Sequence, residues 1–246
     1  MSSTRFVIPA LTLLLGLIVG FLIASKIDRS ELERLRADNE GLKAQTDVSP
    51  EAQSALTDDE IVARLNEAES RKDDFQFQKN LGTALYRYAA MKQDADLLLK
   101  IKPVVERAAA LGPTDIDILN TAGNLFFDLA YLKKDPKGYR MAREYYSKVL
   151  TKRPEDPNVL TDLGLTYFLD DPPDYTEAAE KLNRAGELNP QDQRALRFAI
   201  QAQLQLGRAA DAEKNLAKLK AASPNDPVVS ELSRAIETAK TRPNKQ

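Results

Sequence analysis

Cysteine, histidine and tryptophan are absent from this 246-residue chain. Without cysteine there is no disulfide and no thiolate nucleophile, and without histidine the commonest acid–base side chain and the usual zinc ligands are missing. A large excess of charge of one sign is also lacking, because 35 basic and 37 acidic residues leave a net charge of −2. Bulk charge therefore offers no footprint for nucleic acid. We expect no nucleic-acid partner, no metal and no cofactor.

Known catalytic motifs are missing as well. The sequence has no P-loop, no dinucleotide-binding glycine fingerprint and no nucleophile elbow. An acidic turn at residues 170–174 lacks the spacing and the glycine of an EF-hand, so we interpret it as a solvated turn with helix caps. The sequence predicts that the protein is not an enzyme.

A long uncharged run lies near the N-terminus. Phe6–Ala24 carries no charge over 19 residues, and as a helix it would span roughly 28 Å, close to the thickness of a bilayer core. A cleaved signal peptide and a buried core helix are the alternatives. A signal peptide usually has a shorter apolar region with small residues before the cut, where this chain has Leu22 and Ile23. The run predicts an uncleaved transmembrane anchor within residues 1–25.

Two sequence signals favour opposite orientations of this anchor. The cations that follow it, at residues 26, 29, 34 and 36, favour a cytoplasmic C-terminal domain. Single N-terminal anchors with very short tails, however, often export the domain behind them. We expect a single-pass protein of a bacterial inner membrane, with a periplasmic C-terminal domain narrowly favoured over a cytoplasmic one.

Residues 26–56 form a polar connection that contains a short heptad pattern. Leu32 and Asn39 take one core position of the heptad, and Leu35 and Leu42 take the other. This pattern predicts a parallel homodimer through a short coiled coil. The alternative is a solvated linker helix, since two heptads are fewer than a coiled coil normally needs.

The remaining sequence consists of paired helical patterns that end in proline. The closing prolines stand at positions 113, 154, 190 and 224, with spacings of 41, 36 and 34 residues. The pattern divides the array (residues 57–240) into a cap helix at 57–71, repeats at about 74–113, 114–154, 155–190 and 191–224, and a capping helix at 226–240, with a tail at 241–246. Pro103 lies inside the second helix of the first repeat, and we expect it to kink that helix or divide it in two.

The spacing of 34 and the Leu-Gly pairs Leu81-Gly82 and Leu163-Gly164 resemble the tetratricopeptide repeat family over about residues 74–224. The resemblance implies an all-α solenoid of helical hairpins, preceded here by the transmembrane helix and the short coiled-coil or linker helix. The spacings above 34 imply extended turns between the helices of a repeat.

The same resemblance implies a groove on the concave face, lined by the first helix of each repeat. The clamp that chaperone-type members use for a terminal carboxylate is not expected, because Lys79 matches its first cation but Thr83, Thr121, Asn158 and Asp162 depart from its pattern. By repeat phase the candidate partner-binding residues are Lys79, Thr83, Tyr86, Arg87, Asn120, Asn124, Phe127, Thr161, Leu165, Phe168, Arg194, Arg197 and Gln201.

These features predict a membrane-anchored adaptor that binds a protein or peptide partner in the groove. The alternative is a structural component that dimerises through its N-terminal region and uses the array as a spacer.

Overall fold

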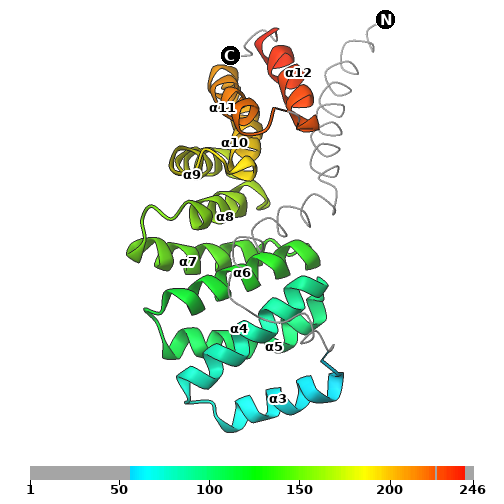
Figure 1. Ribbon diagram of the computed structural model, residues 1–246, viewed down its shortest axis with the longest axis vertical. Coiled ribbons are helices and arrows are strands. Elements are labelled where there is room, and N and C mark those ends of the chain that lie inside the picture. Colours follow the sequence, from blue (N-terminus) through cyan, green and yellow to red (C-terminus); the bar gives the residue numbers. More distant parts are fainter. Residues whose placement is uncertain (1–55, 225, 242–246) are drawn as a thin grey trace, which may run out of the picture. The chain divides into compact units, whose positions relative to one another are not determined.

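The computed structural model describes residues 56–224 and 226–241, which belong to a compact unit that begins at Leu56. The predicted anchor Phe6–Ala24 and the predicted dimer positions Leu32, Leu35, Asn39 and Leu42 lie outside the described residues and stay predictions. The described residues fold into the helices α3 (Asp58–Ser70), α4 (Phe75–Lys92), α5 (Ala95–Leu111), α6 (Ile116–Lys133), α7 (Lys137–Lys152), α8 (Pro157–Phe168), α9 (Tyr175–Leu188), α10 (Gln193–Gln205), α11 (Ala209–Ala222) and α12 (Pro227–Thr241) (Figure 1).

These helices pack as hairpins that stack in chain order. The hairpins are α4/α5, α6/α7, α8/α9 and α10/α11; α3 packs on the first and α12 on the last (Figure 1). The helix pairs α4 and α6, α8 and α10, and α10 and α12 also contact each other, and they do so more closely than the second helices of neighbouring hairpins in the described part. The first helices therefore form the tighter, inner layer of an all-α, tetratricopeptide-like solenoid. The predicted fold class is confirmed for this part of the chain.

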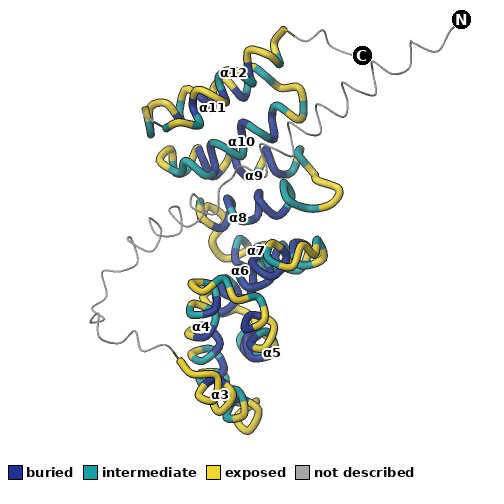
Figure 2. Tube along the Cα trace, turned by 90° about the vertical axis from the view of Figure 1, so that its right-hand side faces the viewer, coloured by how far each residue is buried: buried dark blue, intermediate teal, exposed yellow. Residues whose placement is uncertain are grey.

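The core runs between the layers, and buried residues lie on the helix sides that face a neighbouring helix (Figure 2). Glycines permit the closest approach within a hairpin. A Cβ atom added to Gly123 of α6 would lie 2.6 Å from the ring of Tyr146 on α7, which is 1% exposed. A single hairpin leaves its other face apolar, so stability comes from stacking neighbours.

The longer repeats owe their length to longer helices. In the first hairpin α4 has 18 residues and α5 has 17, and residues 93 and 94 alone separate them. The widest turn, residues 169–174, belongs to the third repeat, whose helices have 12 and 14 residues and whose closing proline gives the spacing of 36. The expectation that spacings above 34 mark extended turns is therefore confirmed for the spacing of 36. It is wrong for the spacing of 41, whose repeat has helices of 18 and 16 residues separated by residues 134–136 alone.

Pro103 does not divide α5, contrary to that part of the expectation. The proline lies on the exposed side of the helix, between buried Ile101 and Val104. Packing of the buried side holds the helix together, while the carbonyl that loses its N–H partner lies on Leu99, which is 48% exposed.

Local capping signals start the helices where the sequence places them. A capping box begins α3, since Glu60 N–H donates to Thr57 Oγ1 (3.2 Å) and Thr57 N–H donates to Glu60 Oε2 (2.8 Å). Asp174 caps α9 by accepting from the N–H groups of residues 176 and 177. No helix in residues 56–224 and 226–241 is both long enough and apolar enough to cross a bilayer.

Candidate functional site

Aspartates begin the first helices of the array and tie neighbouring repeats together. In each case one carboxylate oxygen, Oδ1, accepts from backbone N–H groups of its own helix. These residues are Asp115 at α6, Asp156 at α8, Asp192 at α10 and Asp226 at α12.

The second oxygen, Oδ2, of three of these aspartates accepts from the first helix of the preceding repeat. Lys79 donates to Asp115 (2.7 Å), Thr161 to Asp192 (2.8 Å) and Arg197 to Asp226 (3.1 Å from Nε). The donor stands five residues after its own N-cap each time. We call these contacts the aspartate ladder. Lys79, Thr161 and Arg197, predicted to bind a partner, are therefore engaged in joining repeats.

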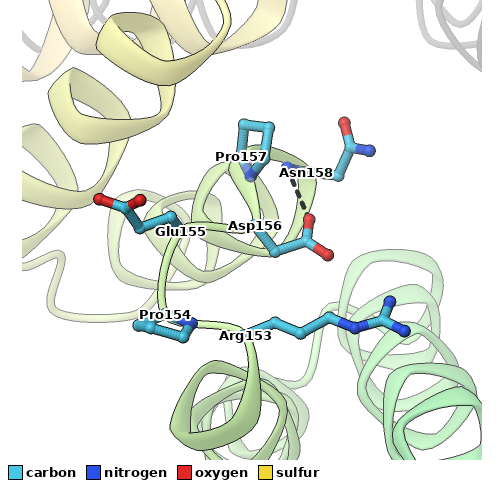
Figure 3. Close-up of a pocket in the computed structure, with 6 residues that line it drawn as sticks. All are labelled: Arg153, Pro154, Glu155, Asp156, Pro157 and Asn158. Atoms are coloured by element: carbon cyan, nitrogen blue, oxygen red, sulfur yellow. Dashed lines mark hydrogen bonds between the residues drawn. The ribbon is translucent and has the colours of Figure 1, made fainter.

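The ladder lacks one rung in the described part of the chain. Asn120 occupies the donor position on α6, but it makes no hydrogen bond to Asp156, and its Oδ1 atom is buried without a partner. Asp156 Oδ1 caps α8, while Asp156 Oδ2 accepts no hydrogen bond from the first helix of the preceding repeat. Asp156 lies in an open crevice of about 550 Å³ lined by residues 153–158, where Arg153, Asp156 and Asn158 point to one side and Glu155 to the other (Figure 3).

Three further candidates also have partners inside the protein. Tyr86 Oη donates to Asp128 (2.9 Å), Asn124 Oδ1 accepts from the hydroxyl of Tyr146 (2.8 Å), and Arg194 donates to Asp162 (2.7 Å). The contacts of Tyr86 and Arg194 join neighbouring repeats, while that of Asn124 joins α6 to α7.

The apolar candidates belong to packed clusters. Phe127 contacts Tyr139 edge to face, and Phe168 contacts Tyr175 and Phe198 in the same way. Leu165 and Thr161 are 3% and 0% exposed. Those last two side chains lie beneath the surface, so they cannot touch a partner in this conformation.

Four candidates make no side-chain hydrogen bond or ion pair within the described residues, namely Thr83, Arg87, Asn120 and Gln201. Arg87 is exposed, and the other three are half-buried. Thr83 Oγ1, like Asn120 Oδ1, is buried without a partner. An unpaired buried polar atom costs about 1–3 kcal/mol, so two of them in one region need an explanation.

The unsatisfied groups gather on α4 and α6. Lys79, Thr83 and Arg87 succeed one another at intervals of four residues on α4, as do Asn120 and Asn124 on α6, so each set shares a helix face. The contacts Lys79–Asp115 and Tyr86–Asp128 hold the two helices side by side over this length. We call Lys79, Thr83, Arg87, Asn120 and Asn124 the inner patch.

The electrostatics of this patch favour a charged lysine. The hydrogen bond to Asp115 raises the pKa of Lys79 above its usual value, outweighing its partial burial. Burial raises the pKa of Asp115, but the bonds from Lys79 and from the backbone of Ile118 outweigh it and leave that pKa below its usual range. Both groups are therefore ionised at neutral pH.

The acidic turn serves packing. Asp170 accepts from Arg143 (2.6 Å) and Arg140 (3.3 Å) of α7, with 9% of its side chain exposed. Residues 56–224 and 226–241 contain no group of three acidic side chains arranged to hold a metal ion.

The sequence carried a signal for the ladder that the repeat-phase reasoning missed. Aspartate precedes the first helix of every repeat, and a polar residue follows five positions later in the first, second, third and fourth repeats. Asp128, the buried partner of Tyr86, had no such periodic signal.

Comparison with known proteins identifies the repeat. A sequence model described as "Tetratricopeptide repeat" matches residues 174–236. Three solved structures share the fold. YrrB, described as a TPR protein with an unusual peptide-binding site, has 19% identity and a TM-score of 0.54 over 72% of this chain and 84% of its own. MamA of AMB-1 has 20% identity and a TM-score of 0.53 over 70% and 81%.

A tetratricopeptide repeat protein from Parabacteroides merdae has 18% identity and a TM-score of 0.53 over 74% of this chain and 65% of its own. At these identities the structures show likeness of fold, and the sequence match covers the last repeats. The chain thus carries tetratricopeptide repeat sequence at residues 174–236 within a tetratricopeptide-like helical solenoid.

Proposed function

We propose that the array is a non-enzymatic adaptor that holds a peptide segment of a partner protein on the inner patch of α4 and α6. The observation that carries the proposal is the pair of buried, unpartnered oxygens on Thr83 and Asn120. In the third and fourth repeats the equivalent residues are Thr161, Leu165, Arg197 and Gln201, and none of them carries a buried side-chain oxygen without a partner within the described residues.

Thr83 and Asn120 are only half-buried as residues, so a change of side-chain rotamer can bring each oxygen to the surface, where an extended peptide supplies the partner that it lacks. Its backbone carries an N–H donor and a C=O acceptor on each residue, which suit the carbonyl of Asn120 and the hydroxyl of Thr83. Arg87 adds an exposed cation that can hold a carboxylate of the segment. The peptide-binding site of the similarly folded YrrB supports the same class of ligand.

Membrane attachment is the second part of the proposal. The 19 uncharged residues Phe6–Ala24 support a single transmembrane anchor. The adaptor would then display its array beside a bacterial inner membrane, with the periplasmic side narrowly favoured.

Site-specific photo-cross-linking tests the adaptor proposal, because the chain has no cysteine of its own. Ala84→Cys places a photoreactive label on the exposed side of α4 next to Thr83, and Ala217→Cys places the same label on the exposed side of α11 as the matched control. In native membranes we expect the α4 label to cross-link one partner that the α11 label does not. Equal cross-linking from both positions would refute the inner patch as the binding site.

A further inference from the structure

Positive charge in the described part of the array is concentrated on the second-layer helix α7 and the residues that flank it. Residues 133–153 contain eight Lys or Arg and two Asp or Glu, although the whole chain has a net charge of −2. Three of these cations are paired, Lys133 with Asp96 and both Arg140 and Arg143 with Asp170. The others are exposed and form no ion pair within residues 56–224 and 226–241; these five, the basic face, are Lys134, Lys137, Lys148, Lys152 and Arg153.

The spacing aligns the lysines of α7 in a stripe. Lys137 and Lys148 are 11 residues apart, which is about three helical turns, and Lys152 follows one turn later. The stripe extends over roughly 22 Å at 1.5 Å per residue. Glu144 lies within it as a single anion, and Lys148 covers the ring of Tyr145 with its ammonium group 5.1 Å from the ring centre.

The neighbouring second helix α9 is organised differently. Lys181 pairs with Glu177 and Glu180, and Arg184 pairs with Glu187 and Glu155. Each cation of α9 is thus neutralised on or beside its own helix. The unpaired lysines of α7 are therefore a local property and not a general feature of the repeat surface.

We infer that the basic face of α7 binds the anionic headgroups of a lipid surface and lays the second-layer side of the array against it. None of the large exposed apolar side chains in the described residues lies on α7, whereas a protein partner normally needs an apolar centre to its interface. Four of these five cations are lysines. A lysine is a point charge on a flexible stem, so it suits a surface of diffuse negative charge better than a pair of acceptor oxygens held in one fixed geometry.

The array can contact a lipid surface and bind a peptide at the same time, because the two surfaces lie on different helices. The inner patch lies on the first helices α4 and α6, while the basic face lies on a second helix. The proposed anchor ends at Ala24 and α3 begins at Asp58, so the tether is short enough to keep the array near the bilayer. The inference uses the anchor for proximity and is independent of the peptide proposal.

A single-cysteine label on the full-length chain tests the inference. Ser147→Cys places a fluorophore on the exposed part of α7 beside Lys148, and the vesicles carry a quencher on their headgroups. They consist either of phosphatidylcholine alone or of phosphatidylcholine with phosphatidylglycerol. We expect quenching to be several-fold stronger on the anionic vesicles and to fall when added salt shortens the Debye length.

Charge reversal supplies the matched comparison. Lys137→Glu, Lys148→Glu and Lys152→Glu together should lower the membrane-contacting population at least ~10-fold, because each lysine near an anionic surface contributes about fivefold. Lys214→Glu, Lys218→Glu and Lys220→Glu on α11 change the charge equally and should leave the quenching unchanged. Circular dichroism checks that both variants keep their helices.

Three results would overturn the inference: equal quenching on the two kinds of vesicle, equal loss in the two triple variants, or displacement of the label from anionic vesicles by a stoichiometric nucleic-acid duplex. Flotation of the chain with neutral vesicles reports the anchor separately. A chain that fails to float there but still shows α7 quenching on anionic vesicles would refute the anchor and support the basic face.

Discussion

Arg197 offers the sharpest test of the aspartate ladder, because the sequence placed it in the binding groove and the structure engages it between repeats. Its guanidinium donates through Nε and a terminal nitrogen to Asp226 Oδ2, and the two side chains are 12% and 3% exposed. Asp226 begins the capping helix α12 by accepting from Val228 N–H. Replacing Arg197 by methionine keeps much of the apolar stem and removes the cation.

The expected cost follows from what remains behind. Breaking a buried ion pair by removing one partner costs about 3–5 kcal/mol, because the other charge stays buried and unpaired. The bond from Val228 and the positive end of the α12 dipole still favour the Asp226 carboxylate, which places the loss near the lower limit, about 3 kcal/mol.

Urea denaturation followed by far-UV circular dichroism measures this loss. Arg184→Met is the matched control, since Arg184 is 46% exposed and its pairs with Glu155 and Glu187 lie at the surface. Its cost should stay below about 1 kcal/mol. Adding Asp226→Asn to Arg197→Met should restore part of the stability, because the amide carries no buried charge. A free energy of unfolding unchanged by Arg197→Met would refute the ladder and return Arg197 to the groove.

The remaining predictions concern helix packing at glycines, the absent bond between Asn120 and Asp156, and stability at acidic pH. Gly123→Ala places a methyl group against the buried ring of Tyr146 and should destabilise the protein by about 1–2 kcal/mol, after the gain in helix propensity is counted. Gly186→Ala meets only the flexible end of Leu196 and should destabilise it less. Thermal melts compare the two variants. Asn120→Lys should reach the free oxygen of Asp156, raise the free energy of unfolding by about 0.5–1 kcal/mol and block the partner, so a stabilised variant that still cross-links would contradict the site. Lys79→Met removes the hydrogen bond that lowers the pKa of Asp115. That bond stabilises the fold above the ordinary carboxyl pKa of about 3.9, and its contribution is lost as the pH falls through the lowered pKa. Denaturation series between neutral and acidic pH should therefore show a smaller loss of stability for the variant than for the wild type.

The elements of the fold follow from signals that lie close together in the sequence. Thr57 and Glu60 mark the start of α3, and aspartates mark the first helices of the hairpins, because a cap and its N–H groups are at most three residues apart. The lengths of the repeats were visible too. Their assignment to turns holds for the spacing of 36 and fails for the spacing of 41, because whether extra residues extend a helix or a loop depends on the apolar surface that the neighbouring hairpin offers.

The roles of the inner-layer side chains could be predicted in part. Repeat phase placed Lys79, Arg87 and Arg197 on one face in sequence terms, yet one of these cations is free and two hold a neighbouring aspartate. What separates them is the offset between stacked first helices, which sets the next repeat's N-cap beside the fifth residue of the helix before it. No single repeat contains that offset, so Thr161 and Leu165 were expected at the surface although they are buried.

One titration tests most directly whether the inner patch of α4 and α6 binds the partner. The partner segment cross-linked from Ala84→Cys would be synthesised as a free peptide and titrated into the wild-type protein, Thr83→Val and Asn120→Lys, with Ala217→Ser on α11 as the control. We predict that the isolated peptide binds and that each inner-patch variant weakens its Kd about tenfold or more, since each removes a hydrogen bond to a buried group, while the control leaves the Kd unchanged. A Kd that neither inner-patch variant alters would contradict the proposal that α4 and α6 hold the partner.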